Sequence, residues 1–207
     1  MSSPDQTAVP SNWNVPNALT TLRIVMVPFF GWALLVDGGE SILWRCIAFV
    51  IFTGAMITDK IDGDIARKKN LVTNFGKIAD PIADKAITGM AFIGLSVIGE
   101  LWWWVTIVVL VREWGITLLR FWVIRHGVIA AGAGGKLKTV LQTIALCGLI
   151  LPLREFAGTL GVIGGYAWWA VAAVMATAVA ITVVTGVDYV LKALAVRRQG
   201  REEAKVS

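Results

Sequence analysis

The sequence predicts an all-α, polytopic membrane protein with six transmembrane helices and a short N-terminal juxtamembrane segment. Of the 207 residues, 57% are hydrophobic and only 16% are charged, whereas soluble domains are about 45–50% apolar and about 25% charged. The apolar residues also form long runs, several of which approach the roughly 20 residues needed to cross a bilayer. Both observations indicate a chain that folds in lipid.

Turn residues and charged residues divide the apolar stretches into six expected helices. They lie at about residues 18–36, 42–66, 75–98, 101–125, 137–153 and 163–192. We expect residues 1–17 to form a cytoplasmic tail and juxtamembrane segment, 18–192 the membrane domain, and 193–207 a basic cytoplasmic tail. Six spans place both termini on the same side of the membrane.

The basic residues predict which side that is, because Lys and Arg concentrate in cytoplasmic loops. The side that holds both termini carries Arg67, Lys68, Lys69, Arg125, Lys136, Lys138, Arg197, Arg198, Arg201 and Lys205. The opposite side has chiefly Arg45 and Arg154. We therefore expect a multi-pass protein of the cell membrane with its active site facing the cytoplasm. Anionic lipid headgroups explain the net charge of +5 more simply than nucleic acid does, because the basic residues flank apolar spans.

The chain contains ten tryptophans, which could form a ligand cage or a membrane-interface belt. Trp102 to Trp104 follow Gly99 and Glu100, and Trp168 and Trp169 follow Gly164, Gly165 and Tyr166. Indoles commonly anchor helices at the headgroup level in such positions. We favour the belt.

Four aspartates lie at or near the ends of apolar helices, where a carboxylate without compensation is costly. Asp59 and Asp62 are three residues apart, and Asp80 and Asp84 are four apart, so each pair shares one helical face. A short loop, residues 68–74, joins the two helices, so both faces can point at a common site. A cluster of carboxylate oxygens favours Mg²⁺, Mn²⁺ or Ca²⁺ over softer metals.

The alternative is that these aspartates form structural ion pairs, which we expect for one or two of them at most. The available partners are Lys60, Lys77, Arg67 and Lys85. The residues after the first pair favour a ligand instead. Gly63 removes a side chain where a ligand would approach the backbone, and Ala66 keeps that face shallow one turn later. Arg67 supplies a guanidinium that matches phosphate oxygens, so the site suits a diphosphate and displacement at phosphorus.

The complete pattern is Asp59-x-x-Asp62-Gly63-x-x-Ala66-Arg67, eight residues, Gly76, three residues, Asp80, three residues and Asp84. This pattern resembles the signature of the CDP-alcohol phosphotransferase family at every defining position. The resemblance implies a six-helix membrane fold, a homodimer and one or two divalent ions, Mg²⁺ or Mn²⁺. It implies that Asp59, Asp62, Asp80 and Asp84 are metal ligands and that Asp62, Gly63, Ala66, Arg67 and Gly76 contact the CDP group. It further implies that Asp84 is the base that deprotonates the acceptor hydroxyl.

Other stretches are similar to the branch of this family that accepts glycerol-3-phosphate. They are residues 15–20 with Arg23, residues 80–85, Arg112 with Glu113, and residues 136–139 with Gln142. The implied reaction is attack of the glycerol-3-phosphate hydroxyl on the β-phosphorus of CDP-diacylglycerol, giving phosphatidylglycerophosphate and CMP. Basic and hydroxyl groups that could bind the acceptor's phosphate are Arg112, Arg120, Lys136, Lys138 and Thr139.

Each of these assignments has an alternative. Lys136 and Lys138 could be cytoplasmic charge markers beside residues 127–135, and Arg112 and Arg120 could pair with Glu113 or reach the interface as snorkelling side chains. The acceptor could be phosphatidylglycerol or inositol phosphate, as in cardiolipin synthases and phosphatidylinositol phosphate synthases. A non-enzymatic alternative is an ion transporter. Against it, the aspartates cluster at one membrane face, and no inverted repeat is detectable.

Overall fold

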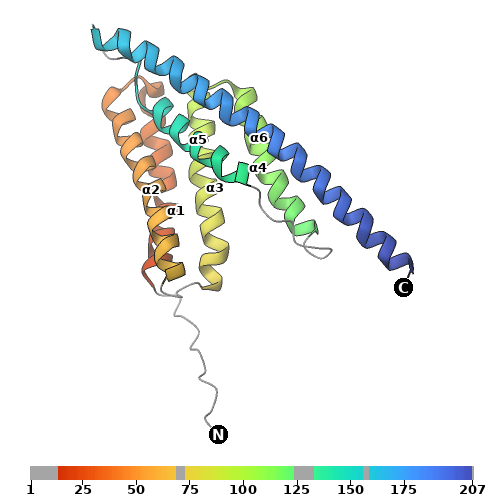
Figure 1. The fold of residues 1–207 in the computed structure, drawn as a ribbon. Helices are drawn as coiled ribbons and strands as arrows, with labels where there is room; N and C mark the ends of the chain where they lie inside the picture. The colour runs from red at the N-terminus through yellow and green to blue at the C-terminus, as the bar shows by residue number, and fades with distance from the viewer. Residues whose placement is uncertain (1–13, 69–72, 124–132, 156–158, 207) are drawn as a thin grey trace. The chain divides into compact units, whose positions relative to one another are not determined.

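The computed structural model describes residues 14–68, 73–123, 133–155 and 159–206, and these residues form helices and short connections. The helices are α1 (Val15–Leu35), η1 (Val36–Gly39), α2 (Ile42–Lys68), α3 (Asn74–Val97), α4 (Trp103–Val123), α5 (Ala133–Ile150) and α6 (Thr159–Val206) (Figure 1). The all-α prediction is therefore confirmed for the described residues, and each of the six predicted helices is present. The chain divides into two compact units, Met1–Gly94 and Leu95–Ser207.

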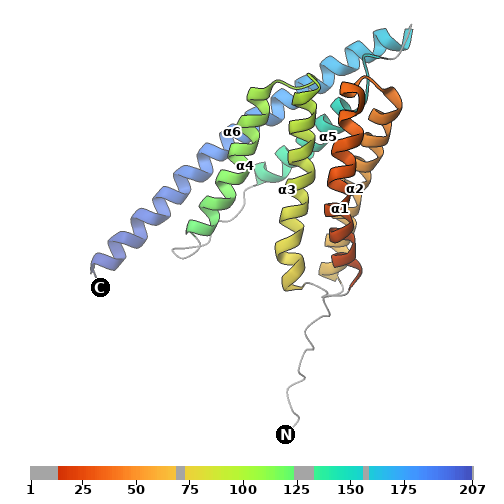
Figure 2. The same ribbon diagram turned by 180° about the vertical axis from the view of Figure 1, so that it is seen from behind.

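In the N-terminal unit, α1 and α2 run side by side (Figure 2). The Asn14 side chain caps α1 by accepting a hydrogen bond from the Asn17 N–H at 3.0 Å. After η1 the chain reverses into α2, and the turn uses positive φ angles of 52° at Asp37 and 66° at Gly38. Glycine adopts such angles without a steric penalty. The turn brings α1 and α2 together, and Phe30 and Phe52 are fully buried between them.

Helix α3 contacts α1 where a glycine on one helix leaves space for a side chain of the other. A Cβ atom on Gly94 would lie 2.6 Å from Leu34 Cδ2, and a side chain on Gly31 would overlap Met90. Small residues at helix interfaces allow backbones to approach in this way. The close contact fixes α3 against α1 near the end of α3 that is remote from the aspartates.

In the C-terminal unit, α6 packs against both α4 and α5. Gly148 of α5 faces Val171 of α6, and a Cβ at Gly148 would meet Val171 Cγ2 at 2.5 Å. At the start of the unit, the hydroxyls of Ser96 and Thr106 share a buried hydrogen bond of 2.6 Å. The long α6 is thus the element on which the other two helices of this unit pack.

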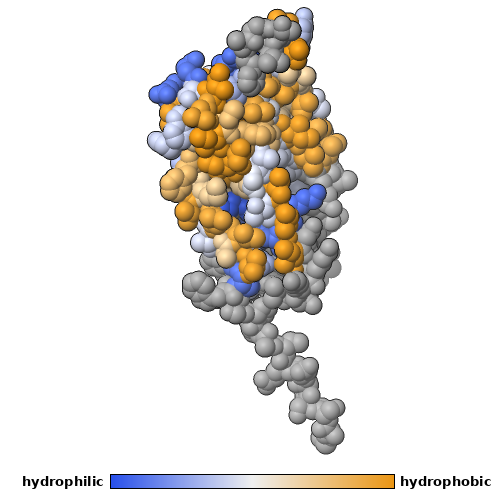
Figure 3. All heavy atoms as spheres, turned by 90° about the vertical axis from the view of Figure 1, so that its left-hand side faces the viewer, coloured by the Kyte–Doolittle hydropathy of each residue, from blue (hydrophilic) through white to orange (hydrophobic). Residues whose placement is uncertain are grey.

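Three segments of the described residues are long and apolar enough to cross a membrane: Val15–Gly39, Ile42–Gly63 and Val162–Ala195. Between 22% and 33% of each apolar stretch is buried within the protein, and hydrophobic side chains cover much of the described surface in Figure 3. Exposed apolar surface of this extent indicates a membrane protein. The count of six spans stays a prediction, because the apolar stretches of α3, α4 and α5 are shorter or contain charged residues.

Three helix ends differ from the prediction by four residues or more. The last helix continues to Val206 and does not end near residue 192, since the residues after the apolar run are good helix formers. Just before that extension, Lys192 donates to Asp188 one turn earlier at 2.7 Å. The fifth helix begins at Ala133 and the sixth at Thr159, each four residues earlier than expected. The predicted juxtamembrane segment falls mainly on residues 1–13, which lie outside the described residues.

Candidate active site

Three polar side chains of α1 lie at intervals of three residues along one face of a mostly apolar helix. These residues, Asn17, Thr20 and Arg23, are 5%, 1% and 2% exposed. A spacing of three keeps them on adjoining turns of the same face. We refer to them as the polar row. Buried polar groups require partners. The partners of this row are Asp59 and Asp62 of α2, Asp80 of α3, and Thr73, which directly precedes α3.

Arg23 joins the first acidic pair. Its Nη1 donates to Asp59 Oδ1, and its Nη2 donates to Asp62 Oδ2 at 2.6 Å. The carboxylates of Asp59 and Asp62 therefore both point at one buried cation. The structural alternative considered from the sequence named lysines and Arg67 as partners, whereas the structure provides Arg23.

Thr20 and Asn17 connect the row to α3. The Thr20 hydroxyl donates to Asp80 Oδ1 at 2.6 Å, and the Asn17 amide donates to the Thr73 hydroxyl at 2.9 Å. The Gly76 N–H in turn donates to Thr73 Oγ1 at 3.0 Å. Three of the four aspartates thus contact one face of α1.

Gly76 leaves space beside these polar groups. A Cβ atom built on it would lie 3.0 Å from Asn17 Oδ1 and 3.6 Å from Asp80 Oδ2. The first of these distances is tighter than an ordinary van der Waals contact, so the amide would have to move. The glycine proposed to contact the CDP group therefore borders the polar row directly.

Asp84 follows Asp80 by one turn of α3 and is half-buried. Its backbone carbonyl accepts a hydrogen bond from the Thr88 hydroxyl at 2.6 Å. Gly63 directly follows Asp62 and is also half-buried. The side chains of Ala66 and Arg67, the other predicted CDP contacts of α2, lie outside the described residues.

The residues suit a divalent cation in their donor chemistry, which consists of carboxylate oxygens. Two of them, Asp59 and Asp62, already converge on a single positive group. In the part of the chain that the structure describes, no group of three or more acidic, histidine or cysteine side chains is arranged to hold a metal ion. The assignment of four metal ligands stays a prediction.

A second polar group lies in the C-terminal unit and consists of Arg112, Glu113, Lys138 and Thr185, the Glu113 cluster. Lys138 Nζ and Arg112 Nη1 both donate to Glu113 Oε1, the latter at 3.2 Å. Arg112 Nη2 donates to Thr185 Oγ1 at 3.2 Å. The ion pair between Arg112 and Glu113 that the sequence offered as an alternative is therefore present. Lys138 is only 4% exposed, which is unusual for a lysine that merely marks a cytoplasmic loop.

The structure shows less about the other residues predicted to bind the phosphate of the acceptor. Thr139 is exposed on α5. The side chains of Arg120 and Lys136 lie outside the described residues. One turn beyond Lys138, the Gln142 amide donates to the Thr182 hydroxyl at 3.0 Å, so polar contacts between α5 and α6 continue past the Glu113 cluster.

Comparison with known proteins decides the family. Residues 13–184 match the family model described as CDP-alcohol phosphatidyltransferase. The chain belongs to this family. The matched region contains the polar row, all four aspartates and every member of the Glu113 cluster except Thr185. The CDP-alcohol phosphatidyltransferase family generally uses a divalent metal.

Relatives within the CDP-alcohol phosphatidyltransferase family carry consistent names. The chain is 50% identical over 181 residues to a "Probable phosphatidylglycerophosphate synthase" of Mycobacterium tuberculosis (strain ATCC 25618 / H37Rv), covering 87% of this chain and 82% of the relative. It is 38% identical over 190 residues to the "CDP-diacylglycerol--glycerol-3-phosphate 3-phosphatidyltransferase" of Bacillus subtilis (strain 168), covering 87% and 95%. A protein of that same name from Sodalis glossinidius is 34% identical over 161 residues, covering 74% and 85%.

Sequence reasoning gave no role to the polar row, although its signal was visible. Three polar residues spaced by three within an apolar helix mark a buried polar face. The same kind of spacing predicts the acidic pairs of α2 and α3, and it is equally present on the helix that contacts them. The sequence indicates Glu113 as a possible partner of arginine, whereas its contact with Lys138 of another helix cannot be read from spacing.

Proposed function

We propose that this protein transfers the phosphatidyl group of CDP-diacylglycerol to glycerol-3-phosphate, giving phosphatidylglycerophosphate and CMP. The observation that carries the proposal is the convergence of Asp59, Asp62 and Asp80 on the polar row of α1. Family membership and the names of relatives at 34–50% identity support it. Buried carboxylates grouped in a membrane protein are expected at a functional site.

In this reaction the acceptor hydroxyl attacks the β-phosphorus of the CDP-lipid. Asp84 takes the proton of that hydroxyl. The hydroxyl oxygen forms a bond to the β-phosphorus, and the bond from this phosphorus to the CMP oxygen breaks, so that CMP leaves with the electron pair. Asp59, Asp62, Asp80 and Asp84 would hold one or two Mg²⁺ or Mn²⁺ ions. When bound, such ions neutralise the negative charge that moves during displacement at phosphorus.

The CDP group is proposed to lie against the carboxylate of Asp62 and the small residues beside it. Gly63, Ala66 and Gly76 leave the helix faces open to a ligand, and Arg67 binds phosphate oxygens. The 3.0 Å approach that a Cβ at Gly76 would make to Asn17 supports this proposal, because it leaves little tolerance for a side chain there. Arg23 holds Asp59 and Asp62 in place beside this surface.

The phosphate of the acceptor is proposed to bind Arg112, Arg120, Lys136, Lys138 and Thr139. Arg112 and Lys138 share the single carboxylate of Glu113, so the Glu113 cluster keeps a net positive charge that a phosphate can use. Charge-assisted hydrogen bonds to phosphate are strong and favour an acceptor that carries its own phosphate.

We further propose six membrane spans, both termini and the active site on the cytoplasmic side of the cell membrane, and a homodimer surrounded by membrane lipids. The proposal includes the division of the chain into an N-terminal tail (residues 1–17), a membrane domain (18–192) and a basic C-terminal tail (193–207). Because α6 is one continuous helix to Val206, its basic end would leave the membrane as a helix. Basic residues concentrated on one side support the orientation.

An assay with three different acceptors tests the proposed function. Purified protein is mixed with CDP-diacylglycerol, Mg²⁺ and either glycerol-3-phosphate, inositol phosphate or phosphatidylglycerol, and CMP release is measured. We expect CMP with glycerol-3-phosphate. Release only with phosphatidylglycerol or inositol phosphate would assign another branch of the family, and no release with any acceptor would favour the transporter alternative.

Asp84→Asn tests the proposed base in the same assay. The substitution keeps the side-chain size but cannot accept the proton, so turnover should be lost while much of the CDP-lipid binding remains. Binding is measured with radiolabelled CDP-diacylglycerol under conditions without acceptor. Normal turnover by Asp84→Asn would refute the role of Asp84.

A further inference from the structure

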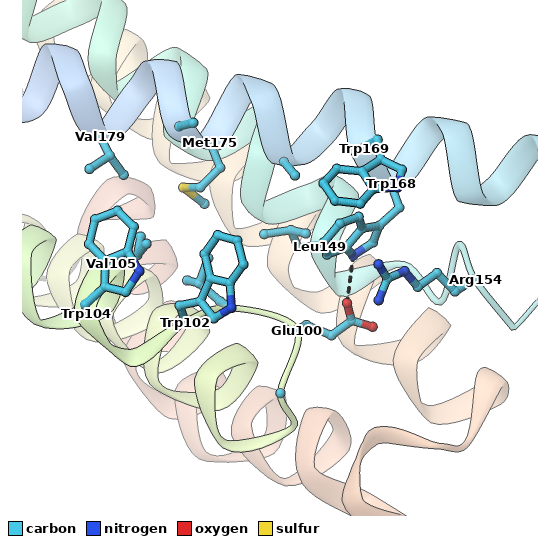
Figure 4. A pocket seen from close by; sticks show the side chains of 14 residues that line it. Glu100, Trp102, Trp104, Val105, Leu149, Arg154, Trp168, Trp169, Met175 and Val179 are labelled. Carbon is cyan, nitrogen blue, oxygen red and sulfur yellow. Dashed lines mark hydrogen bonds between the residues drawn. The ribbon is translucent and has the colours of Figure 1, made fainter.

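A chamber of about 300 Å³ lies in the C-terminal unit, between the start of α4, the end of α5 and the first half of α6. Figure 4 shows the side chains around it. Its apolar lining includes Trp102, Trp104, Val105, Leu149, Met175 and Val179. The volume is at the lower end of the range for small-molecule sites, so it suits part of a flexible molecule such as an acyl chain.

The charged groups of the chamber gather at one end. In Figure 4, Glu100 and Arg154 lie beside Trp168, whereas Trp104 and Val179 lie at the other end. Trp168 Nε1 donates to Glu100 Oε2 at 2.8 Å. The Arg154 guanidinium carbon lies 3.6 Å from the centre of a Trp168 ring, a cation–π contact. One indole therefore positions both a carboxylate and a guanidinium at the mouth of an apolar chamber.

This chamber is separate from the Glu113 cluster of the same unit. The nearest lining residue on α4, Val105, precedes Arg112 by seven residues, and the nearest on α6, Val179, precedes Thr185 by six. At about 1.5 Å per helical residue these separations correspond to about 10 Å and about 9 Å. The proposed transfer reaction uses none of the residues at the mouth of the chamber.

The mouth carries one positive and one negative group, and the interior is apolar. A phosphate matches the Arg154 guanidinium, and a primary ammonium matches the Glu100 carboxylate. A purely anionic headgroup would meet Arg154 but also the negative charge of Glu100. A choline headgroup has no N–H to donate to the carboxylate. The indoles of Trp102 and Trp169 on the lining are 68% and 64% exposed, as expected at the level of lipid headgroups.

We propose that this chamber binds a membrane phospholipid with a phosphoethanolamine headgroup. Its phosphate lies on Arg154, its ammonium lies on Glu100, and one acyl chain enters the apolar chamber toward Met175. The site is a lipid-binding site distinct from the one that holds the proposed CDP-lipid substrate.

Lipid retention by the full-length protein tests the proposal. Protein in detergent is titrated with equimolar phosphatidylethanolamine, phosphatidylglycerol and phosphatidylcholine of identical chains, and bound lipid is counted by native mass spectrometry. We expect the wild type to retain phosphatidylethanolamine about tenfold more than the other two, since one charged hydrogen bond contributes about that factor. Arg154→Gln and Glu100→Gln should each lose this preference, and Trp168→Phe, which has no indole N–H, should weaken it.

The matched controls are Lys192→Gln and Asp188→Asn, which remove exposed, paired charges of α6 and should keep the preference. Equal retention of the three lipids by the wild type would overturn the proposal. The proposal would also be overturned if Arg154→Gln and Glu100→Gln kept the wild-type preference. It would be overturned as well if a second copy of the chain occupied the site and no lipid were bound.

A measurement on the wild type alone decides the question if the variants do not fold. Tryptophan fluorescence is recorded with phosphatidylethanolamine or phosphatidylglycerol that carries bromine atoms on one acyl chain. Bromine quenches nearby indoles, so quenching should saturate at about tenfold lower mole fraction for the ethanolamine lipid. Identical quenching curves for the two lipids would contradict the proposal.

Discussion

Arg23 holds two carboxylates with one buried side chain. The side chain is 1% exposed, and its two terminal nitrogens reach Asp59 and Asp62. Its Nε is buried and has no hydrogen-bond partner in the structure. A guanidinium suits this position because its fork of donors can engage two acids at once. Arg23 therefore keeps the acidic pair compensated when no metal ion is bound.

Replacing Arg23 with Gln should lower the free energy of unfolding by about 3 kcal/mol. This is the lower end of the range for breaking a buried pair, because the Asp59 side chain is 39% exposed. Added Mg²⁺ should recover part of that loss in the variant, since it would compensate the same carboxylates. Unfolding of detergent-solubilised protein is followed with and without Mg²⁺.

The control for this change is Lys192→Gln, which removes an exposed ion pair and should cost about 0–1 kcal/mol. Equal stability of Arg23→Gln and Lys192→Gln would show that Arg23 does not compensate the acidic pair.

Gly76→Ala should reduce CMP release by about tenfold, which corresponds to about 1.4 kcal/mol of transition-state stabilisation. The added methyl would press on Asn17 Oδ1 at 3.0 Å and disturb the polar row beside Asp80. The rate is measured under saturating substrates for the variant and for Gly54→Ala. Gly54 of α2 has open space at its Cβ position, so its substitution should leave the rate near that of the wild type. Equal rates for the two variants would contradict the proposed role of Gly76.

The candidate site could be predicted in part because carboxylates in apolar helices are rare and their spacing is visible. Asp59 with Asp62, and Asp80 with Asp84, stand out on that basis. The partner of the first pair could not be found from spacing, since Arg23 lies on another helix. Contacts between helices depend on tertiary packing, which one sequence does not display.

Among the helices, Gly148 determines how closely α5 and α6 pack. A Cβ at this position would lie 2.5 Å from Val171 Cγ2 and 2.8 Å from Val171 Cγ1. At this contact α6 contributes the larger side chain, Val171, and α5 contributes the glycine that leaves room for it. Small residues allow this close helix packing in membrane proteins.

Gly148→Ala should lower the free energy of unfolding by about 1–3 kcal/mol, the usual cost of overpacking. Thermal unfolding in detergent measures the loss, with Gly165→Ala as the control because nothing lies near the Cβ position of Gly165. A variant at Gly148 as stable as the control would show that α5 and α6 can separate without cost.

The helices were predictable as elements because apolar runs and polar breaks alternate along the chain. The ends of the helices were less predictable. The end of α6 was placed near residue 192, where the apolar run stops, whereas the helix continues because Asp188 and Lys192 pair along its side and helix-forming residues follow. Hydrophobicity marks where a helix meets lipid, and helix propensity decides how far the backbone stays helical.

For the whole molecule, composition predicted a membrane protein, and the exposed apolar surface of α1, α2 and α6 agrees with that prediction. The same hydropathy does not single out α3, α4 and α5 as spans. These helices carry Asp80, Asp84, Arg112, Glu113 and Lys138, so the charges proposed for function are also the charges that weaken the signal for a span. The number of spans and their orientation are therefore the properties that the sequence determines least directly.

CMP release by the purified protein with CDP-diacylglycerol and labelled glycerol-3-phosphate, before and after dialysis against a chelator, tests the central claim most directly. The account predicts that CMP and labelled lipid form in equal amounts, that both stop after dialysis, and that both return when Mg²⁺ or Mn²⁺ is added in excess of the chelator. Full turnover in the presence of the chelator, or CMP release without labelled lipid, would contradict it.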